Sequence, residues 1–546
     1  MTTATVTKRK KSRSRAQETT TLDRLRAVDW TIWLFLIVVV FFAVLRFRLR
    51  DVVLERDEGE YAYSGQLILQ GIPPYQLAYN MKLPGTYVAY ALIMSVFGES
   101  TSGIHAGLLV MNAATSLLIF LLARRLFGTV AGAFAGMCYA LTSSSPAVLG
   151  FAAHSENFVV FAAVAGLLLL VNAMERDSLS LLFGAGTCLG LAFLMKQPGA
   201  VFAVFALLYF LNDNRQRLNW EYAFPRLAAL LGGMIWPFAL TCVILYRAGV
   251  FRNFWFWTFS YASAYGSEVS FAEAVIVFKD AVRRILPIGW PICFLAVLGL
   301  VALRCVPRAF PRRDFVVGWL IFSAIGVSAG FYFRNHYFVL LLPVISLLAG
   351  LALASIPEAL ENWPSVHTVA EPVARWMPVA IFTLVFVTAM VQQRHFLFAE
   401  NAIVASNRIY GDNPFLAARE VGKYLESASS PDTRVAILGS EPEIYFYAHR
   451  HSATGYIYTY GLLENQQYAV RMQQEMIEEI TRARPEFVIF VDDELSWLGT
   501  QEAFFNWIQS YINESYKKAA QVDVGGKAEH LLGNMPRIYV FRLKSR

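Results

Sequence analysis

Charged residues are scarce in this chain. Asp, Glu, Lys and Arg together make up only 16% of its 546 residues, whereas 56% are hydrophobic. Soluble globular domains carry about 25% charged residues, so the composition excludes a soluble protein and predicts one that crosses a membrane several times. The net charge of +7 does not indicate nucleic-acid binding, because the basic residues collect between apolar segments, where they set membrane orientation.

Cysteines are also few, and their positions carry no pattern of metal ligands. All five lie within or beside apolar segments, and the spacing predicts neither a zinc site nor a disulfide framework. They are Cys138, Cys188, Cys242, Cys293 and Cys305. The sequence shows no internal repeat and no nucleotide-binding motif, so neither a repeat protein nor a nucleotide-dependent enzyme is indicated.

A basic tail precedes the first long apolar run. Residues 1–27 are rich in Lys, Arg, Thr and Ser, which is typical of a disordered segment that stays on the cytoplasmic side. The run Trp30 to Leu45 could be mistaken for a signal peptide. We interpret it as an uncleaved first span, because no clear small-x-small cleavage site precedes the polar loop that follows.

Ten further apolar runs predict eleven spans in all. With the N-terminus inside, Arg124 and Arg125 fall on the cytoplasmic side, as the positive-inside rule requires. Tyr87 to Phe97 is shorter than the ~20 residues that a span needs, so we expect an interfacial helix there. The further spans are predicted near 104–123, 130–149, 157–173, 179–195, 199–211, 226–246, 286–303, 315–332, 337–355 and 376–391. This topology describes a multi-pass protein of the plasma (inner) membrane, with a transmembrane domain over 28–391.

The loop 46–102 and the C-terminus are then extracytoplasmic. From about Gln392 the composition becomes that of a soluble domain. Short β-rich runs at Arg434–Leu438, Phe487–Val491 and Arg537–Phe541 alternate with helix-like stretches. Residues 392–546 are therefore predicted to form a small extracytoplasmic α/β domain.

Chemistry is expected in the first outer loop. It holds two adjacent carboxylates, Asp57 and Glu58, and one lysine ahead of a proline, Lys82. Ionisable residues at span ends on one side of a membrane favour a functional reading, because a charge inside a bilayer is costly. The topology brings further groups to the same outer face. These are Tyr61, Tyr75 and Tyr79 in the loop, then His154, Glu156, Lys196, Arg334 and His336.

Such a set suits transfer of a sugar from a lipid phosphate. Fixed cations would neutralise the departing phosphate, and the candidates are Lys82, Arg334, Lys196 and His336. Asp57 would serve as the base for an acceptor hydroxyl, with Glu58 assisting. The three tyrosines, together with His154 and Glu156, would bind the sugar and the acceptor.

Several of these residues also have a purely structural interpretation. Asp57 and Glu58 could cap a helix, and Lys82 could be a lysine that extends to the interface. His154 and His336 could be buried interfacial histidines, and Lys196 could end a helix. No cofactor is required, although Asp57 with His154 or Glu156 could bind a divalent metal.

The order of these features resembles the multi-pass glycosyltransferases of the GT-C fold. An apolar span is followed by Asp57-Glu58 with Tyr61, then Lys82-x-Pro84, then an interfacial helix ending in Phe97-Gly98. The branch that it resembles contains protein O-mannosyltransferases and the aminoarabinose transferases of lipid A (families 39 and 83). Further elements shared with that branch are 124–128, 194–196, 336–343 and 441–446.

The resemblance implies a polyprenyl-phosphate sugar donor and inversion at the anomeric carbon. It implies that Asp57 activates the acceptor and that Lys82 contacts the donor phosphate. The aminoarabinose enzymes have arginine where this chain has Glu60 and glutamate where it has Met81, which argues against aminoarabinose as the sugar.

The sequence thus predicts a glycosyltransferase that acts on an extracytoplasmic glycolipid, polysaccharide or protein. A transporter or lipid-linked-sugar flippase is the alternative, but transporters place ionisable residues near the bilayer midplane and often have repeated halves. A third alternative is a non-catalytic anchor for the C-terminal domain, which leaves the polar outer residues unexplained.

Overall fold

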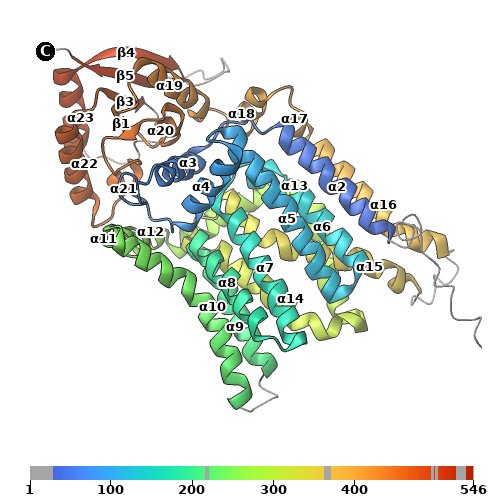
Figure 1. The fold of residues 1–546 in the computed structure, drawn as a ribbon. Coiled ribbons are helices and arrows are strands. Elements are labelled where there is room, and N and C mark those ends of the chain that lie inside the picture. Colours follow the sequence, from blue (N-terminus) through green and yellow to red (C-terminus); the bar gives the residue numbers. More distant parts are fainter. Residues whose placement is uncertain are drawn as a thin grey trace, which may run out of the picture.

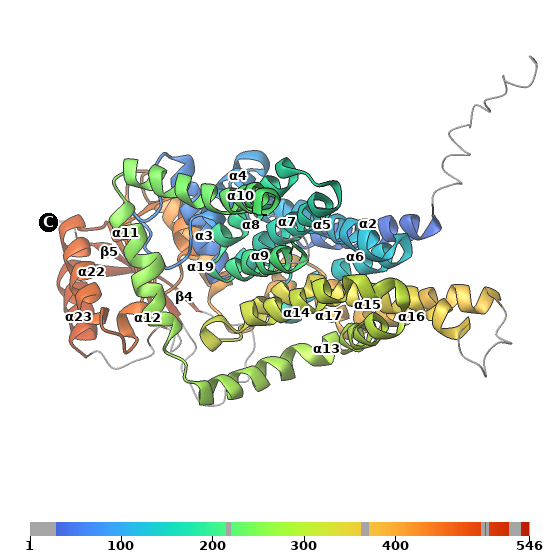
Figure 2. The ribbon, with the colours of Figure 1, turned by 90° about the horizontal axis from the view of Figure 1, so that it is seen from below.

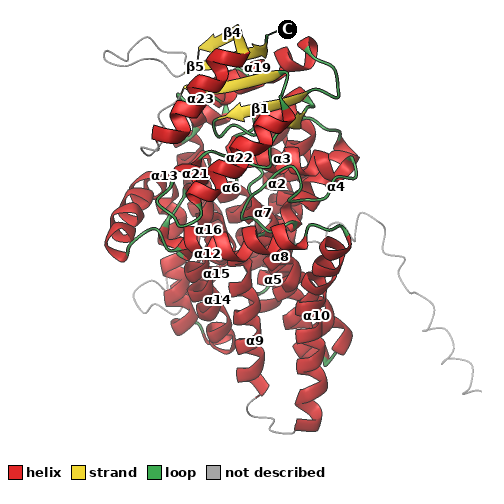
Figure 3. Cartoon of the chain, turned by 90° about the vertical axis from the view of Figure 1, so that its left-hand side faces the viewer, coloured by secondary structure: helices red, strands yellow, loops and turns green. Residues whose placement is uncertain are grey.

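The protein is a bundle of long helices with a small α/β domain at one end, as seen in the computed structural model (Figures 1 and 3). The structure describes residues 29–214, 220–361, 371–492, 497, 502–523 and 537–544. The predicted basic tail, 1–27, lies outside the described residues.

Each of the eleven predicted spans coincides with a helix. These helices are α2 Trp30–Arg48, α5 Thr101–Phe127, α6 Thr129–Ser143, α7 Ser155–Arg176, α8 Leu179–Met195, α9 Ala200–Asn214, α10 Trp220–Arg247, α13 Phe271–Cys305, α14 Arg313–Val327, α15 Leu342–Glu361 and α16 Glu371–Gln392. Within the described residues, 7 helical segments are long and apolar enough to cross a membrane. The multi-pass prediction is therefore confirmed. Shorter apolar helices also belong to the bundle, such as α6 with 15 residues and α8 with 17.

The helices begin and end where the local sequence allows. Asp29 caps α2 by accepting a hydrogen bond from the backbone N–H of Thr31 at 3.0 Å, and Arg46 and Arg48 occupy its last turn, where the helix dipole favours cations. Gly186 on α8 lies against the backbone of α10, so closely that a Cβ atom there would clash with the carbonyl oxygen of Leu230. Small residues of this kind let membrane helices pack closely.

The segment 46–102, which the sequence predicts to be the first outer loop, contains two helices, α3 (Arg56–Leu69) and α4 (Gly85–Phe97). The second, over the predicted interfacial segment, has 13 residues. Both helices lie at the end of the bundle that carries the C-terminal domain (Figure 1).

The C-terminal domain begins with α17 (Arg394–Leu397), α18 (Ala402–Tyr410) and α19 (Phe415–Ala428). Its sheet has five strands in the order β2-β1-β3-β5-β4. β1 pairs in parallel with β2 and β3, whereas β5 is antiparallel to β3 and β4. The strands are β1 Arg434–Leu438, β2 His451–Ser452, β3 Phe487–Asp492, β4 Tyr516–Asp523 and β5 Arg537–Leu543, and the helices between them are α20 Glu443–Ala448, α21 Tyr460–Leu463, α22 Ala469–Ala483 and α23 Glu502–Ser515.

An aromatic segment joins the domain to the bundle. It consists of α11 (Phe251–Trp255), a π-helix η4 (Phe256–Tyr261) and α12 (Ala262–Gly266). Trp257 lies 5.8 Å from Tyr456 between ring centroids, and Phe256 lies 5.1 Å from Tyr468. Much of this aromatic surface is therefore covered by the C-terminal domain, which fixes the domain over the first loop (Figure 2).

Candidate active site

Helix α3 begins with a capping box that sets the direction of its acidic side chains. The Glu55 carboxylate accepts from the backbone N–H of Glu58 at 3.0 Å, and the Glu58 carboxylate reaches back to the N–H of Glu55. Glu58 is buried and also accepts from the N–H of Ala153 at 2.6 Å and lies 3.0 Å from Nε2 of His105. The structure therefore places Glu58 in a structural cap, and its predicted assistance to Asp57 has no contact to support it.

Lys82 lies at the centre of the site. Its Nζ is 2.8 Å from Oδ1 of Asp57 and 2.9 Å from Oε2 of Glu60, and it lies 4.6 Å from the centroid of the Tyr61 ring. The Tyr75 hydroxyl donates to the carbonyl oxygen of Lys82 at 2.7 Å and so fixes its backbone. Asp57 and Lys82, which are distant from each other in the loop sequence, are thus in direct contact.

Burial would raise the pKa of the Asp57 carboxyl, but the charge of Lys82 holds that pKa well below its usual range. Burial opposes the charged form of Lys82, yet Asp57 and Glu60 raise its pKa. The site therefore holds an ionised carboxylate beside a protonated lysine.

Glu60, a residue of the first loop for which the sequence predicts no catalytic or binding role, is the second acidic partner of Lys82. Burial raises the pKa of Glu60, although Lys82 opposes the shift. Its two oxygens accept from the hydroxyls of Tyr87 at 2.5 Å and Tyr458 at 3.0 Å. The available signal was its position, three residues after Asp57 and on the same face of a helix.

A second ion pair lies next to the first. Lys196, at the C-terminal end of α8, pairs with the buried carboxylate of Glu156 at the start of α7. The Lys196 Nζ is 4.3 Å from the centroid of the Tyr337 ring. Burial opposes the charge of Lys196, but Glu156 raises its pKa. Lys82 and Lys196, two of the four groups predicted to hold a phosphate, therefore have acidic partners in this structure.

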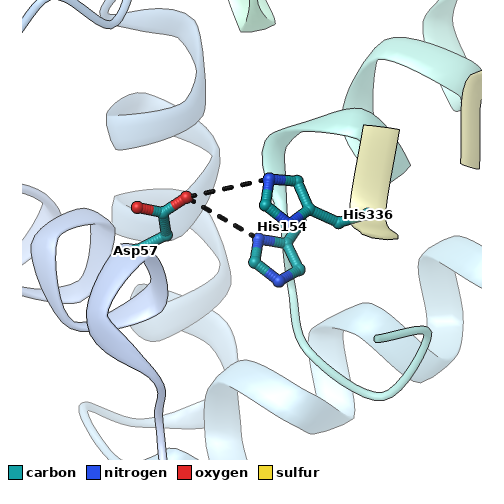
Figure 4. A group of neighbouring side chains, drawn as sticks. All are labelled: Asp57, His154 and His336. Carbon is teal, nitrogen blue, oxygen red and sulfur yellow. Dashed lines mark ion pairs between the residues drawn. The ribbon is translucent and has the colours of Figure 1, made fainter. Parts of the chain in front are cut away.

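Two histidines complete the centre of the site. The rings of His154 and His336 are stacked, with centroids 3.9 Å apart and planes inclined by 9°. Nδ1 of His154 and Nε2 of His336 each lie 4.0 Å from Oδ2 of Asp57 (Figure 4). These three side chains could hold a metal ion, because one ligand atom of each lies within 4.8 Å of the others.

Two predicted residues lie further out. Arg334 is exposed at the edge of the site, and its guanidinium is 5.8 Å from the centroid of the Tyr332 ring. Tyr79 stacks on Trp257 and donates to Glu479 of the C-terminal domain at 3.4 Å. Tyr79 therefore belongs to the contact between the domains and does not reach Lys82.

The C-terminal domain contributes to the site directly. The Tyr458 hydroxyl donates to Glu60 and lies 3.1 Å from the carbonyl oxygen of Arg56, and the Arg56 guanidinium pairs with Glu441 at 2.8 Å. Sequence reasoning missed Tyr458. Its only signal was the alternation of three tyrosines at 456, 458 and 460 in an otherwise soluble domain.

A cavity of 670 Å³ lies elsewhere, between α13 and α14. It is lined mainly by apolar side chains such as Val297 and Val317, with Arg304 and Arg313 among them, and contains none of the predicted site residues. Its lining also includes the carboxylate of Asp314, which pairs with the neighbouring Arg313 at 3.4 Å. Because the charged residues predicted from the sequence gather around Lys82 and away from this cavity, we place the candidate active site at the charged cluster.

One protein-family model matches part of this chain. The model of a family described as dolichyl-phosphate-mannose-protein mannosyltransferase matches residues 82–243. The matched segment starts at Lys82 and includes His154, Glu156 and Lys196. A sequence search among curated proteins gives no match.

Solved structures match over nearly the whole chain. The chain is similar to ArnT from Cupriavidus metallidurans in the apo state, with a TM-score of 0.57 and 14% identity over 93% of this chain and 97% of that one. The same protein bound to undecaprenyl phosphate gives a TM-score of 0.56 and 16% identity over the same shares. The chain has the GT-C fold. The predicted fold class is thereby confirmed.

A more distant GT-C protein shares the same architecture. The archaeal oligosaccharyltransferase AglB from Archaeoglobus fulgidus, in complex with an inhibitory peptide and a dolichol-phosphate, matches with a TM-score of 0.51 and 13% identity over 85% of this chain and 70% of that one. Matches at these identities establish a shared arrangement of helices. The roles of Asp57, Lys82 and their neighbours stay predictions that depend on the geometry described above.

Proposed function

We propose that this GT-C protein is a glycosyltransferase that transfers a sugar from a polyprenyl-phosphate donor to an acceptor at the extracytoplasmic face of the plasma (inner) membrane, with inversion. The observation that carries the proposal is the contact of Asp57 with Lys82 at the end of the bundle where the C-terminal domain lies. The family match from Lys82 onwards and the GT-C fold support it. The fold match also argues against a transporter or flippase.

In the proposed reaction, the acceptor oxygen bonds to the anomeric carbon while the bond from that carbon to the phosphate oxygen breaks. The polyprenyl phosphate leaves with the electron pair, and the acceptor proton passes to Asp57. Lys82, Lys196 and Arg334 stabilise the charge on the departing phosphate. Tyr61 is fully buried with its ring beside Lys82, and it helps to position that lysine.

The resting ion pairs define how the donor would bind. Lys82 has Asp57 and Glu60 as partners, and Lys196 has Glu156. A phosphate that binds both lysines partly neutralises their positive charge, so the electrostatic attraction between Lys82 and Asp57 becomes weaker. The pKa of Asp57 then rises, so that the carboxylate becomes a better base when the donor is present.

The test is transfer from radiolabelled polyprenyl-phosphate sugars to a membrane extract by the purified protein. The Asp57→Asn variant is expected to lose at least a hundredfold in rate, the usual scale for a general base. Asp280→Asn is the matched control, since Asp280 is half-exposed and pairs with Arg283 within its own helix. Equal rates for Asp57→Asn and Asp280→Asn would remove Asp57 from the proposed role, and no transfer from any donor in the panel would contradict the proposed function.

A further inference from the structure

We infer that the cavity between α13 and α14 binds one anionic phospholipid, with its phosphate at Arg304 and Arg313 and an acyl chain along the apolar lining. Arg304 lies in the last turn of α13, and Arg313 is the first residue of α14. Figure 2 shows α13 along one edge of the bundle, beside α14. The inference concerns lipid binding and stands apart from the proposed sugar transfer.

The first argument is the size and lining of the cavity. Its volume of 670 Å³ lies within the ~300–1,000 Å³ of pockets that bind small molecules. Val297, Leu300 and Val301 line it from α13, and Val317 and Leu320 line it from α14. Val297 and Val301 are half-exposed. The cavity is therefore open along the side of the bundle, and an acyl chain can enter it from the bilayer.

The second argument is that the helix arrangement keeps this cavity open. Both α13 and α14 pack against α15. The contact of α13 is close, because a Cβ atom on Gly299 would lie 2.1 Å from the carbonyl oxygen of Leu348 on α15. Since α15 holds α13 in place, α13 cannot move across to α14 and fill the space between them.

The third argument is the charge at the mouth of the cavity. Arg304 is exposed and has no hydrogen-bond or ion-pair partner among the residues that the structure describes. Arg313 pairs with its neighbour Asp314 at 3.4 Å, and the two side chains are 50% and 69% exposed. Exposed ion pairs of this kind contribute little free energy, so Arg313 is able to turn to a phosphate.

The other charges nearby do not cancel the positive charge. Arg125 and Arg312 share the carboxylate of Glu175 as their partner, which leaves an excess of arginine at this end of the bundle. Basic pockets between membrane helices on the cytoplasmic side bind anionic lipid headgroups. The combination of an apolar cavity with unneutralised arginines at its mouth therefore fits an anionic phospholipid better than a neutral one.

The position of the cavity separates this lipid from the proposed sugar donor. Helix α14 has 15 residues and so runs about 21 Å from Arg313 to Val327. The candidate active site lies beyond Val327, where the segment η7 (Asn335–Leu341) carries His336. The predicted topology places the Arg313 end on the cytoplasmic side. We therefore assign the cavity to a membrane phospholipid of that leaflet.

The experiment titrates the delipidated full-length protein in detergent with dioleoyl phosphatidylglycerol. Native mass spectrometry counts the bound lipids. The reaction of Cys305 with a maleimide locates them, because Cys305 is exposed and lines the cavity. Phosphatidylglycerol should slow that reaction at least fivefold, whereas phosphatidylcholine at the same concentration should not. Cys293, on the same helix but outside the lining, should react at an unchanged rate with either lipid.

Two variants and a matched control test the residues. Arg304→Gln should weaken phosphatidylglycerol binding about fivefold, the scale of one arginine at an anionic surface. Val301→Trp should fill the cavity and abolish the protection of Cys305. Arg283→Gln is the control, because Arg283 is an exposed arginine near the other end of α13. Phosphatidylglycerol should raise the Tm of the wild type and of Arg283→Gln, but not that of Val301→Trp.

Four results would overturn the inference. They are no protection of Cys305, equal protection by phosphatidylcholine, equal affinity of Arg304→Gln and Arg283→Gln, and stronger protection by undecaprenyl phosphate, which would assign the cavity to a lipid carrier. Protection by millimolar inorganic phosphate alone would reduce the site to an ion site and overturn it as well. Phosphatidylglycerol binding without sugar transfer would keep this site and remove the proposed function, and transfer by a protein that binds no phosphatidylglycerol would do the reverse.

Discussion

The two sides of helix α3 carry charged residues of different kinds. On the side toward the bundle, Asp57 is partly exposed, with a side chain 26% accessible, and is paired with Lys82. On the side toward the C-terminal domain, Arg56 pairs with the buried Glu441, and Glu443 is fully buried with neither carboxylate oxygen hydrogen-bonded to any residue the structure describes.

The difference separates a site suited to chemistry from one suited to holding domains together. A carboxylate that water and substrate can reach, next to a cation, stays ionised and can exchange partners. A carboxyl group that is buried between two domains is held in place by packing, and ionising it would destabilise the folded protein. One short helix therefore supplies a base on one side and a docking surface on the other.

The largest expected effect comes from Lys82→Ala on the bundle side. Removing the ammonium deletes the proposed phosphate contact and leaves Asp57 and Glu60 without their cation. Loss of one such charge-stabilising donor typically costs a hundredfold or more in rate. Transfer assays should show that loss, whereas Lys423→Ala, on an exposed lysine of α19, should leave the rate unchanged. If Lys82→Ala stayed active, the bundle side of α3 would have no more part in the reaction than the side that contacts the C-terminal domain.

Gly59→Ala tests the docking side. A Cβ atom on Gly59 would lie 2.6 Å from the Cα of Glu443, and backbone cannot yield as a flexible side chain can. Overpacking of this kind costs about 1–3 kcal/mol, so we expect a lower Tm and easier proteolytic release of the C-terminal domain. The control is Gly266→Ala, because the added Cβ atom would lie in open space. Gly71 is less suitable, since its positive φ would strain an alanine there. An unchanged Tm for Gly59→Ala would mean that the domains do not pack there as described.

Glu443→Gln tests the cost of the buried carboxyl group. Burial, followed by the neighbouring Glu441, raises the pKa of Glu443 well above its usual value, against the opposing charge of Arg56. The folded protein then holds the proton more tightly than the unfolded chain. Stability contributed by the neutral form is present below the usual carboxyl pKa of ~4.3 and falls by up to about 1.4 kcal/mol per pH unit as the pH rises towards the raised value.

The amide of Glu443→Gln does not titrate, so the variant should lose less Tm between pH 5 and pH 8 than the wild type. Glu420→Gln, on an exposed side chain of α19, should keep the wild-type dependence. If wild type and Glu443→Gln respond alike to pH, the group is ionised when folded and the docking side is not sealed.

Tyr458→Phe is expected to have the smallest effect, because it removes one hydroxyl that links the two sides through Glu60 and the Arg56 carbonyl. A single hydrogen bond to a charged group is worth about 1.5–3 kcal/mol, and Tyr87 and Lys82 continue to hold Glu60. We expect a rate several-fold lower and only a small drop in Tm. Tyr424→Phe, on a surface tyrosine of α19, is the control, and a rate equal to wild type for Tyr458→Phe would show that the domain does not reach the chemistry.

Local patterns were enough to predict much of the fold. Apolar length located the eleven helices, and β-branched runs located β1, β3 and β5. The patterns missed β2, which has two residues, and β4, because Tyr516–Asp523 continues a helical pattern and becomes a strand only by pairing with β5.

By itself, the sequence determined that this is a multi-pass membrane protein with polar groups gathered at one end, because hydrophobic length and charge position act locally along the chain. Only the tertiary structure decided that Glu60 accompanies Asp57 at Lys82 while Glu58 serves as a cap, because helix rotation settles which of two nearby carboxylates faces a neighbour. It also decided that His154 meets His336 and that Tyr458 enters from another domain, since contacts between distant segments leave no periodic trace in the residues themselves.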